Sequence, residues 1–246
     1  MRLAAIADVH GNCAALEAVL ADMAALGIAE VVNLGDHVSG PLEPRRTADL
    51  LMARGFPSIR GNHDRVLAEA AADMGASDRY AHAELDAGHL AWLASLPATL
   101  VYCDDVLLCH GTPRHDLTYW LDHVTADGTV AAAPIEAIEA EAGGIAASLI
   151  LCGHTHLPRV VRLRDGRLVV NPGSVGCPGY RWDVPVEHVV EAGTPHACYA
   201  ILERTEGVWH TTIRHVPYDH MRMAELAARN GSLVWASALA TGWCGE

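Results

Sequence analysis

Side chains suited to binding a metal ion follow several apolar stretches of this chain. The clearest case is residues 31–36, VVNLGD, where a strand-like run stops at Gly35 and Asp36. The glycine allows a turn with close backbone approach, and Asp36 then lies at the carboxyl end of the strand, where open α/β sheets bind their ligands. The complete candidate set is Asp8, His10, Asp36, Asn62, His110, His154 and His156.

This set supplies carboxylate, amide and imidazole ligands and contains no cysteine, which suits divalent ions such as Mn, Fe, Zn or Ni. In Asp8-x-His10 and His154-x-His156, an extended backbone would place both side chains on one side, roughly 6–7 Å apart. Each pair could serve one metal ion or two neighbouring ions. Two ions roughly 3.5–4 Å apart need a bridging ligand, and Asp36 is the natural candidate because a carboxylate can bind both.

Each of these residues also has an ordinary structural interpretation. A pair of the Asp-x-His kind occurs by chance, Asn62 or Asp64 can cap a helix, and a His-x-His pair can lie on the surface. Their joint occurrence after strand-like runs favours a metal site.

His63 is adjacent to Asn62 but is not needed as a ligand, so it is the candidate proton donor, with a packed loop histidine as the alternative. Arg60 and Arg65 flank this motif and could contact either phosphate or solvent.

The first two thirds of the chain alternate strand-like and helix-like segments. Apolar residues at helical spacing after Asn12, a good N-cap, predict a first helix that ends at Gly27. The other expected segments are strands at 2–7, 29–34, 56–59, 100–102, 106–109 and 149–152, and helices at 47–54, at 64–96 with breaks at Gly75 and Gly88, and at 134–141.

Beyond residue 158 the apolar period changes to two, which is typical of strands, and two turn signals indicate hairpins. We expect an antiparallel second sheet stacked on the first, with helices outside, all in one domain of residues 1–246. The expected elements are hairpins of 160–163 with 168–170 and of 199–202 with 208–213, then a helix at 220–229 and a short tail.

Composition limits the class of protein. The chain has 246 residues, of which 51% are hydrophobic, enough for a large core. No apolar run reaches the roughly 18 residues of a membrane span, and the amino terminus lacks a signal-peptide pattern. Seven scattered cysteines without a CxxC pair indicate reduced thiols, so we expect a cytoplasmic protein that binds no membrane.

The formal net charge of −13 disfavours a nucleic-acid partner. A small phosphorylated substrate is compatible with it, because bound metal ions make an acidic site locally positive. The oligomeric state stays open, a homo-oligomer included.

Taken together, five motifs resemble those of the calcineurin-like metallophosphoesterases. They are Asp8-x-His10, Gly35-Asp36, Gly61-Asn-His-Asp64, His110-Gly and Gly153-His-x-His156, within residues 1–176. The resemblance implies an α/β fold, a four-layer αββα sandwich of two mixed β-sheets flanked by helices. It also implies a dinuclear site, with Asp8, His10 and His156 on one ion, Asn62, His110 and His154 on the other, and Asp36 bridging. The chain is similar to the small bacterial and archaeal phosphodiesterases of the YfcE type, which share the element found here at 110–113.

The resemblance implies a metal-dependent phosphoesterase that cleaves phosphodiesters of small molecules, with phosphomonoesters as a second substrate class. Two bound ions would lower the pKa of a water and neutralise charge on the phosphoryl oxygens, while His63 would protonate the leaving oxygen. A non-catalytic scaffold is the alternative, and the complete ligand set favours the enzyme. A nuclease is disfavoured by the acidic charge and by the absence of a basic or aromatic-rich binding stretch.

The chain departs from the Ser/Thr protein phosphatases after Gly35-Asp36. Those enzymes carry an acidic residue and an arginine there, whereas Ser39 stands where the carboxylate would be. This disfavours a protein phosphatase and also an Asp–His pair behind His63. Residues 177–197 have no counterpart that the resemblance assigns, and we interpret them as a surface loop in preference to a border of the substrate site.

Overall fold

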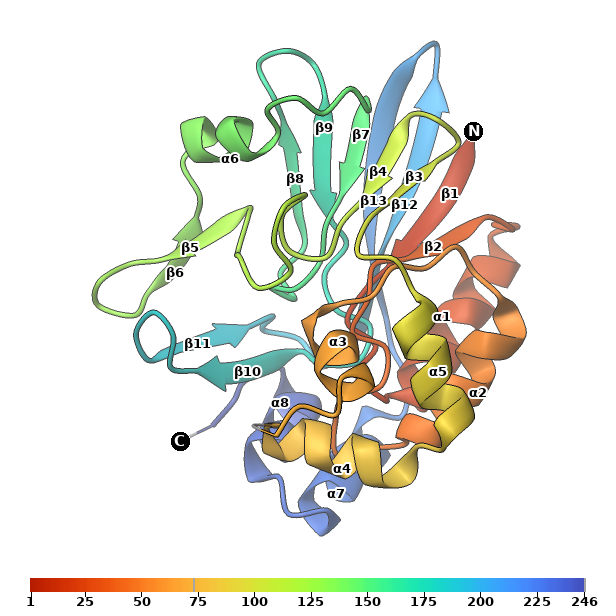
Figure 1. Cartoon of the computed structure of the whole chain (residues 1–246), viewed down its shortest axis with the longest axis vertical. Helices are drawn as coiled ribbons and strands as arrows, with labels where there is room; N and C mark the ends of the chain where they lie inside the picture. Colours follow the sequence, from red (N-terminus) through yellow and green to blue (C-terminus); the bar gives the residue numbers. More distant parts are fainter. Residues whose placement is uncertain (73, 246) are drawn as a thin grey trace.

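The computed structural model describes residues 1–72 and 74–245, and its two main β-sheets pack against each other (Figure 1). The first sheet has the order β13-β12-β1-β2, in which β1 pairs parallel with β2 and antiparallel with β12. The second has the order β3-β4-β7-β9-β8, with β4, β7 and β9 parallel and both edge strands antiparallel. The strands are β1 Arg2–Ile6, β2 Val31–Asn33, β3 Leu100–Tyr102, β4 Val106–Leu108, β7 Leu149–Leu151, β8 Arg159–Arg162, β9 Leu168–Asn171, β12 Ala197–Thr205 and β13 Val208–Val216.

Alternation along the strands divides the apolar side chains between two faces. Leu3 and Ala5 of β1 share a fully buried cluster with Leu149 of β7, between the two sheets. Ala4 and Ile6 belong to a second cluster on the other face of β1, together with residues of the first helix. A layered packing therefore follows directly from the period of two.

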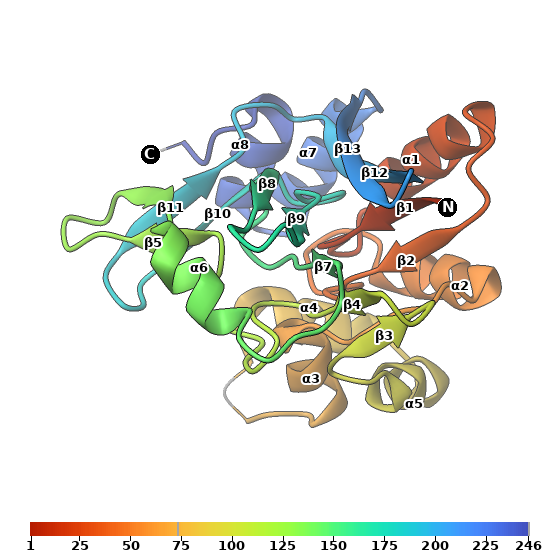
Figure 2. The ribbon, with the colours of Figure 1, turned by 90° about the horizontal axis from the view of Figure 1, so that it is seen from above.

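Helices cover the outer face of each sheet (Figures 1 and 2). Helix α1 (Cys13–Ala25) packs on the first sheet through Leu16 and Val19, with α2 (Pro44–Arg54) beside it. Helix α6 (Ile135–Glu141) packs on the second sheet, where Ile138 contacts the cluster that contains Ile150. The predicted αββα sandwich of mixed sheets is confirmed.

Further helices and two small hairpins surround this sandwich. In Figure 1, α3, α4, α7, α8 and the β10–β11 hairpin lie below the sheets, at the end where β1 finishes. The elements are α3 Asn62–Ala68, α4 Ala76–Glu84, α5 Ala87–Ser95, α7 His220–Arg229, α8 Leu233–Thr241, β5 Asp122–Val124, β6 Val130–Ala132, β10 Gly179–Trp182 and β11 His188–Glu191.

The helical predictions are mostly confirmed, with errors at their ends. Asn12 caps α1 as expected, since its side chain accepts the N–H of Ala15 at 3.1 Å. Helix α2 begins at Pro44, three residues earlier than predicted, because proline fits the first turn of a helix. The predicted short tail is wrong, because residues 233–241 form α8.

The region predicted as helical from 64 to 96 contains three helices. The break at Gly75 is confirmed, since this residue precedes α4. Gly88 lies inside α5, and the break falls instead before Asp86, whose carboxylate accepts the N–H groups of Gly88 and His89. Asp64 is the third residue of α3 and not its N-cap residue, but its carboxylate accepts the N–H of the N-cap residue Gly61 at 2.8 Å and so helps to cap the helix.

Both predicted hairpins form, but they do not build a second sheet by themselves. The β8–β9 hairpin extends the sheet of β4 and β7, whereas β12 returns to pair with β1, with Leu3 opposite Leu202. This pairing covers an edge of β1 that would otherwise expose its backbone hydrogen-bonding groups. The strand expected at 56–59 is reduced to a single bridge between Asn33 and Ser58. Among the helices in the described ranges, none is long and apolar enough to cross a membrane.

Candidate metal centre

The seven candidate ligands lie in loops that follow β1, β2, β4 and β7 and in the first turn of α3. Backbone hydrogen bonds beyond the strand ends tie these loops together. The N–H of Asp8 donates to Gly35 O at 3.0 Å, and that of Gly153 donates to His110 O at 2.7 Å. Because β1 is parallel to β2 and β4 is parallel to β7, the four loops meet at one end of the sandwich.

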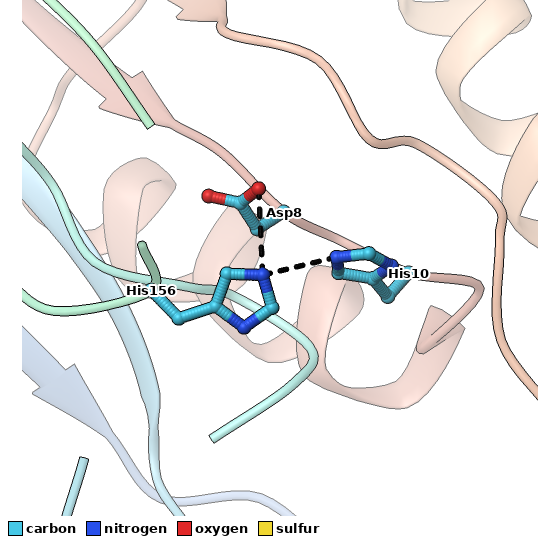
Figure 3. A group of neighbouring side chains, drawn as sticks. All are labelled: Asp8, His10 and His156. Atoms are coloured by element: carbon cyan, nitrogen blue, oxygen red, sulfur yellow. Dashed lines mark hydrogen bonds and ion pairs between the residues drawn. The ribbon is translucent and has the colours of Figure 1, made fainter. Parts of the chain in front are cut away.

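One group of ligand atoms consists of Asp8, His10 and His156 (Figure 3). His156 Nε2 lies 3.1 Å from His10 Nε2 and 3.6 Å from Asp8 Oδ1. All three side chains are buried, and their ligand atoms lie within 4.8 Å of one another. A single ion could contact all three.

The second group contains Asp36, His110 and His154, again with ligand atoms within 4.8 Å of one another. His110 Nε2 lies 3.2 Å from Asp36 Oδ2 and 3.1 Å from Asn62 Oδ1. The same Asp36 oxygen is 3.8 Å from His10 Nε2 in the first group. Asp36 therefore lies between the two groups, and the structure brings all seven predicted side chains together.

Each candidate histidine uses its other ring nitrogen to bond a backbone carbonyl. A carbonyl only accepts, so that nitrogen carries the proton, and in a neutral ring the inward nitrogen keeps a free lone pair. Partners of this kind orient metal-binding histidines in general. The pairs are His10 Nδ1 with Ser39 O (2.7 Å), His110 Nδ1 with Leu34 O (2.7 Å), His156 Nδ1 with Cys177 O (2.7 Å) and His154 Nε2 with Leu117 O (3.1 Å).

The inward nitrogens of the neutral rings are consequently acceptors, and two of them face each other. His10 Nε2 and His156 Nε2 are 3.1 Å apart, with no proton to share between two neutral rings. Asp8 Oδ1 is buried and has no hydrogen-bond partner among the described residues. Buried unpaired groups of this kind cost about 1–3 kcal/mol each, and a divalent cation would satisfy them together. The residues present therefore fit a divalent metal ion.

Burial keeps most of these imidazoles neutral, which is the form that binds metal. It lowers the pKa of His10 to about 4 and the pKa of His154 to about 3. Burial opposes the charge of His110 too, but the Asp36 carboxylate raises the pKa of His110 to about 10. Burial also raises the pKa of Asp8 to about 8. Protons and metal ions therefore compete for the same buried atoms.

The backbone at five of the seven candidate ligands is left-handed, not extended as predicted for the two paired motifs. The angle φ is 54° at Asp8, 49° at His10, 55° at Asp36, 71° at His154 and 59° at His156. This conformation costs a residue other than glycine about 1–2 kcal/mol, and such strain gathers at functional sites. The side chains converge because of tight turns, so the argument from alternation along a strand was wrong.

Two glycines allow the loop after β2 to touch the start of α3. A Cβ on Gly61 would lie 2.7 Å from Asp36 Cγ, and a Cβ on Gly35 would lie 2.8 Å from Gly61 Cα. Asp64 holds the same contact, because its buried carboxylate accepts the N–H groups of Asp36 (2.8 Å), His37 (3.0 Å) and Gly61 (2.8 Å). Asp64 thus links two motifs, a role that its reading as a helix cap missed.

His63 lies in the first turn of α3 with 30% of its side chain exposed. Its backbone N–H donates to Asp36 Oδ1 at 3.0 Å, and its ring centroid is 5.5 Å from that of His10. Nδ1 lies 2.8 Å from Asp78 Oδ1, which overturns the expectation that no Asp–His pair stands behind this ring. Burial opposes its charge, but the Asp36 and Asp78 carboxylates raise the pKa of His63 to about 9.

Within residues 177–197, β10 and β11 form a hairpin that borders the site at Tyr180, whereas residues 181–185 are exposed, so the interpretation as a surface loop is wrong at Tyr180. The Tyr180 ring packs edge-on against His156 with centroids 4.8 Å apart, and its hydroxyl bonds that of Tyr119 at 2.7 Å. Tyr119 packs in turn against His154, at 5.2 Å. The two tyrosines thereby support two candidate ligands. No local pattern in the sequence marks them for this role.

Of the two flanking arginines, Arg65 has its side chain bonded to a carboxylate. Arg65 donates two hydrogen bonds to Asp116, at 2.7 and 3.2 Å, and so ties α3 to the loop after His110. Arg60 donates its backbone N–H to Pro97 O at 2.9 Å.

The model of the calcineurin-like phosphoesterase superfamily domain matches residues 1–207. The chain belongs to this superfamily. It is 26% identical over 262 residues to the uncharacterized protein MJ0912 of Methanocaldococcus jannaschii, over 95% of this chain and 94% of that protein.

A solved structure agrees with this assignment. A metallophosphoesterase from Sphaerobacter thermophilus superposes with a TM-score of 0.76 at 27% identity, over 98% of this chain and 100% of that one. YfcE, a phosphoesterase from E. coli, matches with a TM-score of 0.41 at 20% identity, over 88% and 100% of the two chains. Membership of the calcineurin-like superfamily supports a hydrolase that uses divalent metal ions, as the motifs predicted.

Proposed function

We propose that this calcineurin-like protein is a dinuclear metal-dependent phosphodiesterase acting on small molecules. The observation that carries the proposal is the position of Asp36 Oδ2, which lies 3.2 Å from His110 Nε2 and 3.8 Å from His10 Nε2. A carboxylate between two ligand groups is the bridge that a pair of ions requires. In this proposal Asp8, His10 and His156 would hold one ion, Asn62, His110 and His154 would hold the other, and Asp36 would bind both.

Two divalent ions held there would lower the pKa of a water toward neutrality and neutralise charge on the phosphoryl oxygens. The chain's own contribution is rigidity. Backbone carbonyls orient the four histidines, and Asp64 fixes the contact between the Asp36 loop and α3. Preorganised ligands of this kind need no rearrangement during the reaction.

His63 would donate the proton to the leaving oxygen. Its Nδ1 is bonded to Asp78, so Nε2 is the nitrogen free to face a substrate, and its ring is partly exposed. With its pKa raised to about 9, the ring carries a proton near neutral pH. As the phosphorus–oxygen bond breaks, the proton passes from Nε2 to the departing oxygen.

The experiment combines metal analysis with hydrolysis of bis(p-nitrophenyl) phosphate. We expect two transition-metal ions per chain, activity that EDTA abolishes and added Mn²⁺ restores, and loss of both metal and activity in Asp36→Asn. Asp49→Asn, which changes an exposed aspartate of α2, is the matched control and should behave as wild type.

Three results would contradict the proposal. They are turnover that survives chelation, a single ion at saturation, and an anomalous-scattering map without a pair of ions at Asp36. A metal-loaded protein that cleaves neither phosphodiesters nor phosphomonoesters would instead be a non-catalytic scaffold.

A further inference from the structure

The ring of His63 is held from behind by a carboxylate on a different helix. Asp78 lies in the first turn of α4, fifteen residues after His63, and is only 5% exposed. Its Oδ1 is 2.8 Å from His63 Nδ1. A buried aspartate facing an imidazole over this distance makes a charge-assisted hydrogen bond.

Ser39 fixes the same carboxylate from the opposite direction. Its hydroxyl donates to Asp78 Oδ1 at 2.7 Å, and the serine is itself buried in the loop after β2. One oxygen thus receives both hydrogen bonds, which holds the aspartate in a single orientation. Burial opposes its ionisation, yet the hydrogen bonds from His63 and Ser39 lower the pKa of Asp78.

A purely structural role for Asp78 would be to cap α4, since acidic residues favour the first turn of a helix. The hydrogen bonds do not follow that pattern. Within the described ranges, the donors to Asp78 are Ser39 and His63, and no backbone N–H of α4 is among them. The carboxylate faces the site, away from its own helix.

We propose that Asp78 is the positioning residue for His63 and that Ser39 holds it in place. This inference rests on the proposed function, in which His63 protonates the leaving oxygen. Asp78 accepts the Nδ1–H, so the ring can turn only Nε2 toward the substrate. When Nε2 gives up its proton, Nδ1 keeps its own proton, which stays hydrogen-bonded to the ionised carboxylate of Asp78. Solvent then returns a proton to Nε2.

The carboxylate behind His63 comes from α4 and not from the loop after Asp36. The loop after Asp36 carries Ser39, whose hydroxyl has no charge, and α4 supplies the charge through Asp78. Because both groups reach the same oxygen, a carboxylate placed at position 39 would lie close to His63 as well. The proposal can therefore be tested by placing a carboxylate at position 39 in a variant that lacks Asp78.

The central test compares Asp78→Ala with wild type on two phosphodiesters, one with an alkoxide and one with a nitrophenolate leaving group. We expect kcat to fall roughly 10-fold or more for the alkyl ester and to change little for the nitrophenyl ester. The loss should be smaller than the roughly 10²- to 10⁴-fold loss that removal of the general acid itself causes. KM and metal content should stay as in wild type. Asp78→Asn, which retains an acceptor oxygen, should lose less.

The matched control is Asp49→Ala, since Asp49 also faces a histidine, His89, at 3.0 Å but lies on the outside of α2. It should leave both reactions unchanged. Adding Ser39→Asp to Asp78→Ala should restore part of the loss for the alkyl ester. A slowly exchanging Nδ1–H signal of His63 in the NMR spectrum should be present in wild type, absent in Asp78→Ala and present again in the double variant.

Equal losses for both esters, release of metal by Asp78→Ala, or an unchanged NMR signal would overturn the inference. If His63→Ala loses activity on alkyl esters while Asp78→Ala does not, the proposed function stands and only the positioning role fails. If wild type shows no metal-dependent hydrolysis, the proposed function fails, whereas the NMR signal still reports the Asp78 contact.

Discussion

The substitution Gly61→Ala tests whether the contact between two motif loops sets the metal affinity. A Cβ at this position would lie 2.7 Å from Asp36 Cγ and 2.7 Å from the Asp36 backbone nitrogen. Carbon atoms in contact prefer about 3.5 Å or more, so the carboxylate carbon or the start of α3 must move by roughly 0.8 Å. Either movement displaces a proposed ligand, because Asp36 lies on one side and Asn62 on the other.

Metal–ligand distances tolerate only about 0.2 Å, so this shift is several times too large. We expect Gly61→Ala to weaken metal binding at least 10- to 100-fold, the loss typical when the partners of metal ligands are disturbed. Its φ of −90° suits alanine, so the fold should lose no more than the roughly 1–3 kcal/mol of an overpacked site.

Gly55→Ala is the matched control. Gly55 ends α2 with φ of 61°, and a Cβ there would meet nothing within 4 Å. It should therefore lower stability by about 1–2 kcal/mol through backbone strain alone and leave metal binding intact. Competition with a chromophoric chelator measures affinity, and thermal unfolding in EDTA measures stability. Wild-type metal affinity in Gly61→Ala would refute the reasoning, since it would mean that the loops can move apart without displacing the metal ligands.

Two further predictions concern single side chains. His63→Ala should keep both metal ions but lower kcat roughly 10²- to 10⁴-fold for alkyl phosphodiesters and much less for nitrophenyl esters; released metal would instead make His63 a ligand. Hydrogen bonds from Arg214 (2.6 and 2.8 Å) and Tyr199 (2.6 Å) lower the pKa of Asp22, so their stabilising contribution is present at neutral pH and is lost as pH falls through that lowered pKa. In urea unfolding with EDTA, Asp22→Asn should therefore be less stable than wild type by about 1–3 kcal/mol at pH 7, and the difference should begin to shrink as pH falls through about 4, the pKa of an unfolded aspartate, and vanish only below the lowered pKa; a constant difference would contradict this account.

Much of the candidate site was readable because its ligands stand next to strand ends in the chain. Asp36 and His154 each follow an apolar run and a glycine. Their place at the edge of a sheet can therefore be predicted from the neighbouring residues in the sequence. The fold class followed from the same alternation of apolar runs and helical patterns. What alternation could not predict was the assignment of strands to sheets, because β12 pairs with β1 nearly two hundred residues away.

The identity of the candidate ligands was therefore determined by the sequence, whereas their support was decided by tertiary structure. His10 and His156 are 146 residues apart, and they are oriented by the carbonyls of Ser39 and Cys177. Every residue has a carbonyl, so no residue type signals this role. The carboxylate behind His63 is a similar case: position 39 in the sequence argued against it, and packing of α4 on the site supplied Asp78. A hydrogen bond depends on where two groups lie in space, and for groups on different elements only the packing of those elements determines that.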